Sequence, residues 1–267
     1  MILIDIIAGA RPNFMKVAPI INAIKKSQRN GGSLTFRLVH TGQHYDPRLS
    51  GSFFEQLNIP QPDINLDVGS GTQAEQTGAI MIKYEKLLID EPSQLCLVVG
   101  DVTSTMACAI TAQKMGVPVA HVEAGIRSGD WSMPEEINRL VTDAVTNWFF
   151  TTSQVANENL KKSGIEENRI FFVGNTMIDT LLANITRFRP PDFWSDLSLD
   201  KNKYIVLTLH RPSNVDELNS FSMLLRSIGR YSRGLPVIFP IHPRTSKSLS
   251  NLDDVPQNIK VVDPQPY

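Results

Sequence analysis

The segment LCLVVGDVTSTMACAITAQKMGVPVAHV, residues 95–122, decides the fold of this chain. It opens on an apolar strand, Leu95–Val99, and continues through a polar turn into a predicted helix over residues 104–114 that ends at Gly116. A second short strand is predicted over residues 118–121. Short apolar runs without polar alternation are typical of strands that are buried on both faces. This strand–helix–strand unit therefore predicts an α/β fold with a mainly parallel sheet covered by helices.

The same alternation extends along most of the chain. It is interrupted over residues 189–202, where Pro190, Pro191 and several Asp and Ser residues leave little periodicity. Beyond this stretch a strand is predicted over residues 204–209 and a helix over 215–231. We therefore expect an N-terminal domain over residues 1–188, a linker over 189–202 and a smaller domain over 203–267.

The composition excludes several classes of protein. The 267 residues carry 26 Lys+Arg and 27 Asp+Glu, a net charge of −1, which argues against binding nucleic acid by bulk electrostatics. A local basic pocket for a phosphorylated small molecule stays open. Cys96 and Cys108 lie in apolar runs and are expected to be buried thiols from a reducing compartment. Because no apolar run approaches about 18 residues, we expect a cytoplasmic protein without a membrane partner.

Six polar clusters each follow the carboxyl end of a predicted strand. In open α/β sheets, ligands bind at this edge. The recurrence predicts a ligand site there, built from residues 8–16, 41–46, 100–105, 121–130, 209–214 and 241–244.

The first cluster, GARPNFMK over residues 9–16, places Arg11 and Lys16 beside the start of a helix predicted over residues 16–28. Cations near a helix N-terminus suit a phosphate group. The segment matches neither of the common glycine-rich phosphate motifs, so a tight turn with two solvated cations is an equal alternative.

The next clusters contribute carboxylates. Asp101 stands at the end of an apolar strand, and Glu123 follows the neighbouring one. Asp101 or Thr103 could instead cap the helix that follows. Taken with Glu135, three carboxylates converge on one sheet edge, where crowding would raise their pKa values toward the range that acid–base catalysis uses.

The start of the helix predicted over residues 134–145 carries further charges. Glu135 and Arg139 are four residues apart and share one helix face, which also fits an ordinary solvated ion pair. Glu136 is expected to turn away from that face.

Histidines complete the polar clusters. His44 ends one strand, His210 precedes Arg211, and His242 lies two residues before Arg244. A lone His at a strand end is more often structural than functional. No ligand spacing typical of a metal site is present in the sequence, so we expect no metal.

Together these motifs resemble the non-hydrolysing UDP-N-acetylglucosamine 2-epimerase family. The matching segments are GARPNFMKVAPI (9–20), TGQHYD (41–46), VVGDVTSTMA (98–107), HVEAGIRSGDWSMPEEINR (121–139), VGNTMIDTL (173–181), TLHRPSNVD (208–216) and IHPRT (241–245). They occur in the order typical of the family, and the fourth is the most specific. Asn13 and Ser213 depart from the family pattern, which has Glu at both positions in many members.

The resemblance implies a GT-B-like fold of two Rossmann-like domains. It also implies the interconversion of UDP-GlcNAc and UDP-ManNAc, through elimination of UDP to 2-acetamidoglucal and re-addition. This reaction would supply ManNAc for cell-surface polysaccharide, without nicotinamide or a metal, in a homodimer that binds a UDP-sugar.

The resemblance assigns site residues by motif. The implied catalytic residues are Asp101, Glu123, Glu135 and His210. The implied substrate-binding residues are Arg11, Lys16, Arg139 and Arg211. A second, activating UDP-GlcNAc site would use Gln43, His44, Gln73 and His242.

Relative to the family, the chain stops before the segments that contact uridine and diphosphate. We therefore expect an incomplete second domain and weak or absent activity. The alternatives are a hydrolysing 2-epimerase, a GT-B glycosyltransferase, or an inactive binding or oligomerisation module.

Overall fold

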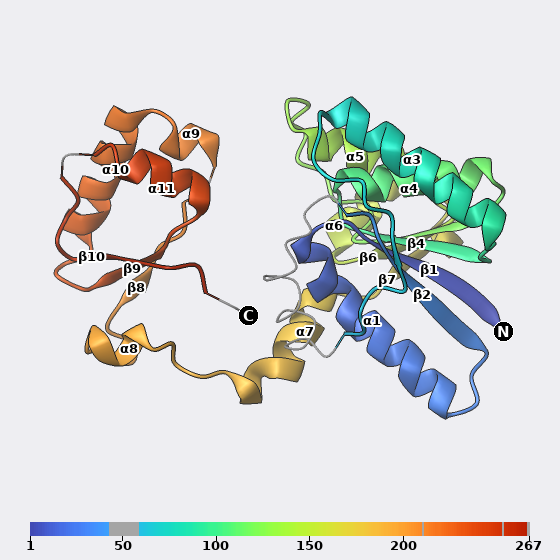
Figure 1. Ribbon diagram of the computed structural model, residues 1–267, viewed down its shortest axis with the longest axis horizontal. Helices are drawn as coiled ribbons and strands as arrows, with labels where there is room; N and C mark the ends of the chain where they lie inside the picture. Colours follow the sequence, from blue (N-terminus) through green and yellow to red (C-terminus); the bar gives the residue numbers. More distant parts are fainter. Residues whose placement is uncertain (43–58, 210, 253, 266–267) are drawn as a thin grey trace. The chain divides into compact units, whose positions relative to one another are not determined.

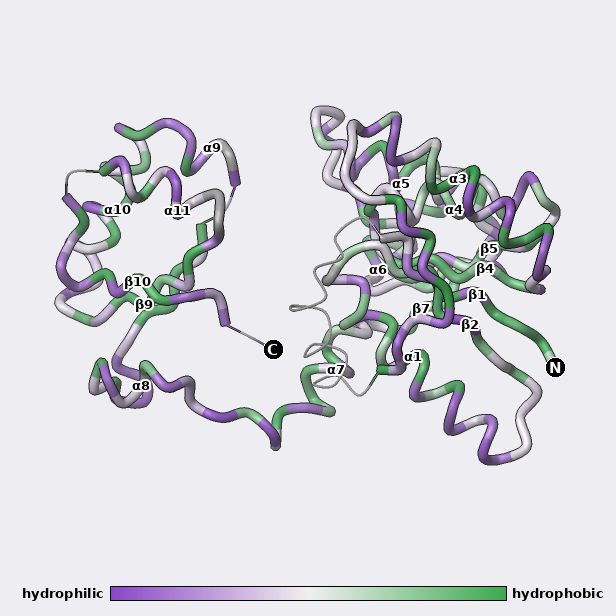
Figure 2. The backbone as a smooth tube through the Cα atoms, in the orientation of Figure 1, coloured by the Kyte–Doolittle hydropathy of each residue, from purple (hydrophilic) through white to green (hydrophobic). Residues whose placement is uncertain are grey.

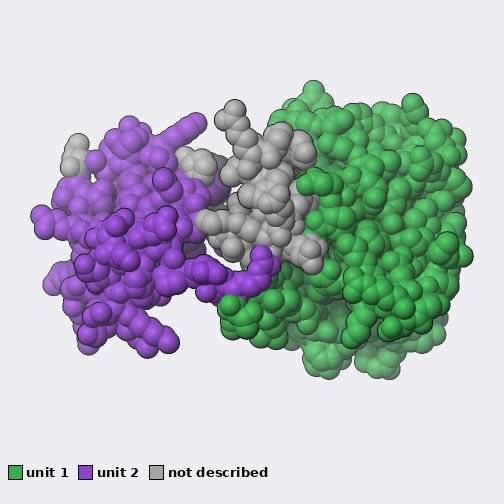
Figure 3. Space-filling model, turned by 60° about the horizontal axis from the view of Figure 1, so that its bottom comes forward, with its two compact units in different colours: residues 1–186 green, residues 187–267 purple. Residues whose placement is uncertain are grey.

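The protein divides into two compact units, residues Met1–Thr186 and Arg187–Tyr267. Figure 1 traces the elements of each unit along the chain, and Figure 3 colours the two units separately. The structure is a computed structural model that describes residues 1–42, 59–209, 211–252 and 254–265. Each unit is described by itself below.

The first unit is built on a seven-stranded sheet with the order β3-β2-β1-β4-β5-β6-β7. Every neighbouring pair of strands is parallel. The strands are β1 (Ile2–Ala8), β2 (Leu34–His40), β3 (Ile64–Asn65), β4 (Leu95–Val99), β5 (Val119–Val122), β6 (Trp148–Thr151) and β7 (Ile170–Phe172). The predicted parallel sheet is thus confirmed.

The strand order reverses between β1 and β4. The chain first runs outward from β1 through β2 to β3, then returns to place β4 on the other side of β1. At such a switch point the two connections leave in opposite directions, which opens a crevice beyond the carboxyl ends of the strands. This reversal fixes where a ligand can enter the sheet edge.

Helices cover both faces of the sheet. Figure 1 shows α3, α4 and α5 on one face and α1 and α7 on the other. In Figure 2, α1 alternates between hydrophobic and hydrophilic residues along its length, as expected for a helix with one apolar face. The helices are α1 (Arg11–Arg29), α3 (Gln73–Asp90), α4 (Thr103–Lys114), α5 (Pro134–Ala144), α6 (Gln154–Lys162) and α7 (Thr176–Asn184), with single 3₁₀ turns at Glu167–Arg169 and Ile185–Arg187.

The core lies between the sheet and these helices. One cluster joins Val98 and Val119 of the strands to Tyr84 of α3 and Ala109 of α4. Cys96 and Cys108 are both fully buried, and burial raises the pKa of the Cys96 thiol to about 12. The prediction of buried core thiols is confirmed.

The second unit contains a parallel sheet of three strands in the order β10-β9-β8. Its core includes Val215, Phe221, Leu225, Phe239 and Ile259. The strands are β8 (Ile205–Val206), β9 (Val237–Pro240) and β10 (Ile259–Val262), and the helices are α8 (Phe193–Asp196), α9 (Pro212–Val215), α10 (Leu218–Tyr231) and α11 (Pro243–Leu249).

Several predicted boundaries were wrong for local reasons. The strand predicted over residues 204–209 is only Ile205–Val206, an edge strand that pairs with β9 alone among the described strands. The helix predicted over residues 215–231 is α10 (Leu218–Tyr231), and Val215 ends a separate short helix, α9. Helix α10 begins where the Glu217 carboxylate accepts hydrogen bonds from the N–H groups of Asn219 and Ser220, at 3.0 and 2.7 Å. Such side-chain capping starts a new helix.

A buried ion pair links the first two strands. Asp5 of β1 lies opposite Arg37 of β2, and the guanidinium donates two hydrogen bonds to the carboxylate, at 2.8 and 2.9 Å. Tyr84 and Ser93 donate to the same carboxylate. Asp5 is 0% exposed, so all of its partners lie inside the protein.

Replacing Asp5→Asn should strongly destabilise the first unit, because Arg37 would lose its buried counter-charge and keep only Glu91, whose side chain is 64% exposed. Breaking a buried pair from one side costs about 3–5 kcal/mol. Urea unfolding followed by circular dichroism measures the change. The matched control is Asp200→Asn, which breaks the exposed Lys203–Asp200 pair and should leave the midpoint unchanged. Equal effects of the two variants would contradict the prediction.

Candidate active site

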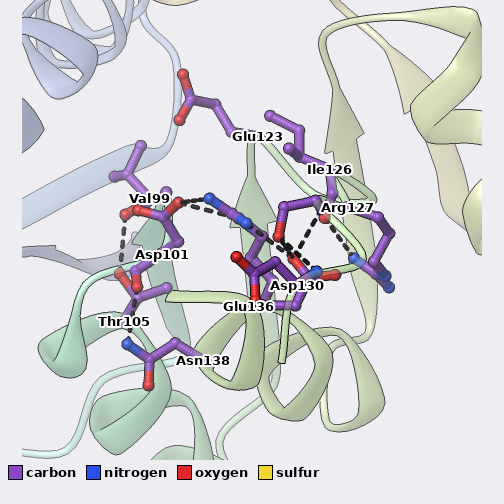
Figure 4. A network of polar contacts seen from close by, with 12 residues as sticks. Val99, Asp101, Thr105, Glu123, Ile126, Arg127, Asp130, Glu136 and Asn138 are labelled. Carbon is purple, nitrogen blue, oxygen red and sulfur yellow. Dashed lines mark hydrogen bonds and ion pairs between the residues drawn. The ribbon is translucent and has the colours of Figure 1, made fainter. Parts of the chain in front are cut away.

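The candidate site lies at the carboxyl edge of the seven-stranded sheet, beside the switch point between β1 and β4. Its side chains come from the start of α1, the turns after β4 and β5, and α5. Figure 4 shows the polar network that runs from Asp101 to Glu136. We describe it from the switch point outward.

Glu123 follows β5 in an unusual backbone conformation. Its φ is +70°, in the left-handed region that few residues other than glycine adopt. Its carboxylate forms an ion pair with the ammonium group of Lys16 from α1, and the two side chains are only 10% and 13% exposed. Backbone strain of this kind costs energy and clusters at functional sites.

Gly100 allows the turn after β4 to approach this ion pair. Its φ is +69°, and a Cβ atom placed there would lie 3.0 Å from Lys16 Nζ and 3.4 Å from Glu123 Oε2. A side chain at this position would therefore be strained and would push against the pair. Glycine brings the adjacent residue, Asp101, to the same edge as Glu123.

Asn13 connects the turn after β1 to the end of β4. Its Oδ1 accepts hydrogen bonds from the N–H groups of Gly9 and Ala10, at 3.0 and 2.9 Å, and its Nδ2 donates to the Val99 carbonyl at 3.1 Å. The side chain is 2% exposed. These bonds satisfy N–H groups just ahead of α1, so the helix begins at Arg11 rather than at residue 16 as predicted. This role of Asn13 was not predicted from the sequence, where the residue stood out only as a departure from the family pattern.

Asp101 is held by α5. Arg139 donates from Nε and Nη2 to the same carboxylate oxygen of Asp101, at 3.0 and 2.5 Å, and Asn138 donates to the Asp101 carbonyl at 2.8 Å. The alternative that Asp101 or Thr103 caps α4 is wrong, because the N-cap residue is Val102 and no side chain caps this helix.

Glu136, not Glu135, is the partner of Arg139. Arg139 Nη1 donates to Glu136 at 2.8 Å, three residues back on the same helix. Glu136 is 2% exposed, whereas Glu135 lies exposed on α5. The predicted Glu135–Arg139 pair was therefore wrong, and so was the prediction that Glu136 turns away from the helix face that carries Arg139. The reason is the preceding loop, whose N–H groups at Ser128 and Gly129 both donate to the Glu136 carboxylate.

These contacts determine the charge of Glu136. Burial alone would raise the pKa of its carboxyl group, but the N–H groups of Ser128 and Gly129 and the Arg139 guanidinium outweigh burial and lower the pKa to about 2. Burial likewise acts against the charge of Arg139, and its hydrogen bonds to Glu136 and Asp101 raise its pKa above the ordinary value. Glu136 and Arg139 are thus both charged at neutral pH.

The structure therefore brings Asp101 and Glu123 to the predicted edge. The contacts described join each of them to a cation, Arg139 or Lys16, rather than to another carboxylate. Lys16, predicted as a phosphate ligand, is engaged by Glu123.

Gln73 lies at the start of α3, where its Oε1 accepts a hydrogen bond from Thr103 at 3.3 Å. It lines a pocket of about 550 Å³ between α3, α4 and α5. Met81, Met106 and Ile137 give this pocket an apolar lining, and Asn138 connects it to the Asp101 turn.

The other predicted residues are placed less fully. Gln43, His44 and His210 lie outside the described residues. Arg11 opens α1, and its side chain also lies outside the description. The second unit carries Arg211 and His242, both exposed.

Within residues 1–42, 59–209, 211–252 and 254–265, no group of three or more His, Cys, Asp or Glu side chains is placed to hold a metal ion. Over the same ranges, none of the helices combines the length and apolar character needed to cross a membrane.

Comparison with known proteins shows the family of this chain. Residues 25–267 match the family model described as UDP-N-acetylglucosamine 2-epimerase. The chain is 40% identical over 277 aligned residues to the UDP-N-acetylglucosamine 2-epimerase of Methanocaldococcus jannaschii, covering 99% of this chain and 74% of that protein. The chain belongs to the UDP-N-acetylglucosamine 2-epimerase family. The predicted membership of this non-hydrolysing enzyme family is thereby confirmed.

A solved structure and a second relative extend the comparison. The crystal structure of the Methanocaldococcus jannaschii enzyme in complex with UDP-GlcNAc and UDP matches all of this chain with a TM-score of 0.83 and 38% identity, covering 74% of that chain. This confirms the GT-B-like α/β fold. A UDP-2,3-diacetamido-2,3-dideoxy-D-glucuronate 2-epimerase from Pseudomonas aeruginosa is 38% identical over 98% of this chain and 72% of its own length.

Replacing Gly100→Ala should lower activity at the site, because the new Cβ would push Lys16 and Glu123 apart. The control is Gly116→Ala, which has a similar φ of +75° but no atom within 4 Å of the added group. Both variants should lose roughly 1–2 kcal/mol of stability through backbone strain. Only Gly100→Ala should reduce turnover, measured as deuterium exchange at C2 of UDP-GlcNAc. Equal turnover in both variants would show that the close approach does not matter.

Replacing Glu136→Gln should destabilise the protein in a pH-dependent way. The folded-state pKa of about 2 lies below the ordinary value of 4.5, so the carboxylate stabilises the folded state above pH 4.5 and this contribution is lost as the pH falls toward 2. The difference in unfolding free energy between wild type and variant should be roughly 2–3 kcal/mol at pH 7. It should shrink between pH 4.5 and 2 in chemical denaturation, and a constant difference would refute the assignment.

Proposed function

We propose that this chain interconverts UDP-GlcNAc and UDP-ManNAc by eliminating UDP and adding it back. The proposal depends on one observation above all: Asp101 and Glu123 lie at the same edge of the sheet, beside its switch point, in a chain that belongs to a UDP-sugar epimerase family. Identity of 40% over nearly the whole chain to a UDP-N-acetylglucosamine 2-epimerase supports it.

The reaction needs a base and an acid on opposite faces of the sugar. The base removes the proton from C2, the C2–H electron pair forms a C1–C2 double bond, and the C1–O bond breaks with its electrons leaving on UDP. The intermediate is 2-acetamidoglucal. Re-addition of UDP at C1, with a proton delivered to the other face of C2, completes epimerisation and balances every atom. Positioned proton transfer contributes roughly 10²–10⁴-fold to such steps.

The carboxylates of Asp101 and Glu123 are suited to this role. Each is held in place by an ion pair with a cation, Arg139 for Asp101 and Lys16 for Glu123. The neighbouring cations Arg139 and Lys16 are proposed to stabilise the negative charge that the diphosphate gains as it leaves. Glu135, exposed on α5, is the third proposed carboxylate.

The remaining assignments derive from the family motifs alone. We propose His210 as a further catalytic residue, and Arg11 and Arg211 as diphosphate ligands. Gln73 and His242, with Gln43 and His44, are proposed for a second UDP-sugar site. A cytoplasmic homodimer, with residues 1–188 and 203–267 as its domains and 189–202 as the linker, completes the proposal.

A second substrate has support from the comparisons. The Pseudomonas aeruginosa relative acts, by its name, on a diacetamido glucuronate sugar, and its identity of 38% is close to that of the first relative. Both sugars share the UDP group and the acidic C2 position, so the same carboxylates would serve either. Protein contacts to the sugar ring would decide which of the two substrates is used.

The test is incubation with UDP-GlcNAc in deuterated water. We expect UDP-ManNAc that carries deuterium at C2, seen by proton NMR and mass spectrometry. Asp101→Asn and Glu123→Gln should each lower exchange by about 10²-fold or more. The control is Glu167→Gln. Glu167 is an exposed carboxylate that pairs with Lys161 and is not one of the proposed site residues, so this variant should leave exchange unchanged.

Other outcomes would identify other functions. Free ManNAc would indicate a hydrolysing epimerase, and release of UDP without deuterium at C2 would indicate glycosyl transfer. Failure to bind UDP in calorimetry would favour an inactive module. Exchange only with the diacetamido glucuronate sugar would move the assignment to the second substrate.

A further inference from the structure

A buried polar group lies behind the candidate carboxylates and takes no part in the proposed chemistry. His121 of β5 is 0% exposed and Asp143 of α5 is 4% exposed. The Nδ1 atom of His121 lies 2.8 Å from Asp143 Oδ1, and its Nε2 atom lies 2.8 Å from the Gly100 carbonyl oxygen. The imidazole ring thus bridges α5 and the turn that precedes Asp101.

Both neighbours of the ring are acceptors. A carbonyl oxygen cannot donate, and neither can the Asp143 carboxylate, so each ring nitrogen must donate to satisfy both contacts. A neutral ring carries only one N–H group. Donation to both acceptors therefore needs a proton on each ring nitrogen.

Asp143 also holds the turn that carries Glu123. Its second oxygen accepts a hydrogen bond from the Gly125 N–H group at 3.1 Å and pairs with Arg127 at 2.7 Å. Burial acts to raise the pKa of Asp143, but His121 and Arg127 outweigh burial and lower the pKa below its ordinary value. Its partners keep this buried carboxylate charged.

The surroundings of the ring are otherwise apolar. Val98 of β4 and Phe149 of β6 flank His121 in register on either side, and both are fully buried. The charged groups described around the ring are Asp143 from α5 and Arg127 from the turn after β5. Asp143 therefore contacts both His121 and Arg127.

We propose that His121 is a buried imidazolium that acts as a positioning residue. Through Gly100 it fixes the turn that carries Asp101, and through Asp143 and Gly125 it fixes the turn that carries Glu123. The two candidate carboxylates thereby keep their spacing. The catalytic consequence rests on the proposed function, whereas the charge of the ring does not.

The charge of the ring is measured first, without substrate. Nitrogen-15 spectra of protein labelled at its five histidines distinguish a doubly protonated ring from either neutral tautomer. The His121 signals are identified by their loss in His121→Asn. We expect both His121 nitrogens to be protonated at pH 7, and Asp143→Asn, which removes the carboxylate, to convert the ring to a neutral form. A neutral His121 ring in the wild-type protein would overturn the proposal.

Two substitutions then separate the two contacts. The amide nitrogen of Asn can occupy the place of Nδ1, so His121→Asn keeps donation to Asp143 and loses the contact to Gly100. The amide nitrogen of Gln can occupy the place of Nε2, so His121→Gln keeps the contact to Gly100 and loses the contact to Asp143. Amide resonances of Gly100 should therefore shift most in the first variant, and those of Gly125 in the second.

Turnover provides the functional arm. Both variants should lower kcat by roughly 10–100-fold with KM changed by less than about threefold, since a displaced carboxylate affects the chemical step. Ser93→Ala removes a buried hydrogen bond to Asp5 and is the control for lost stability, with kcat expected to stay at the wild-type value.

The outcomes separate the two proposals. Wild-type kcat in both His121 variants, or unchanged resonances at Gly100 and Gly125, would overturn the positioning role. A wild-type protein that does not epimerise would refute the proposed function instead, and the nitrogen spectra and amide shifts would still decide the role of His121.

Discussion

The reversal of strand order between β1 and β4 is the constraint on which the site depends. Because neighbouring connections depart in opposite directions there, the carboxyl ends of these strands are left uncovered by their own helices. Asn13 ties the end of β1 to the end of β4, and Gly100 lets the second turn come close to Lys16 and Glu123. Residues far apart in sequence therefore reach one edge of the sheet.

Charge at this edge is organised as pairs of opposite sign. Asp101 is bound to Arg139 and Glu123 to Lys16, and Arg139 also binds the buried Glu136. A pair can hold a carboxylate in a fixed place and in its charged state, whereas clustered carboxylates repel one another. The order of the site thus comes from cations on α1 and α5, two helices on opposite faces of the sheet.

Much of this could be predicted from the sequence. Strand ends were found because apolar runs stop abruptly at Gly100 and His40, and the family was found because several motifs follow in order. The side-chain partners could not be predicted. Helix spacing allowed Arg139 to face Glu135 or Glu136, and only the path of the loop at residues 128–133 decides between them. Asn13 and His121 were missed as site-building residues because partners of each lie far away in the sequence: Val99 for Asn13, and Gly100 and Asp143 for His121.

The Asp5–Arg37 pair has a consequence for how the sheet assembles. These residues lie opposite each other in β1 and β2, where both charges meet inside the protein. A slip of one residue would send their side chains to opposite faces and break this buried pair, at a cost of several kcal/mol. Two aliphatic strands would tolerate such an error far better. The pair thus favours the observed register of β1 and β2, and this register sets where the two strands end at the switch point.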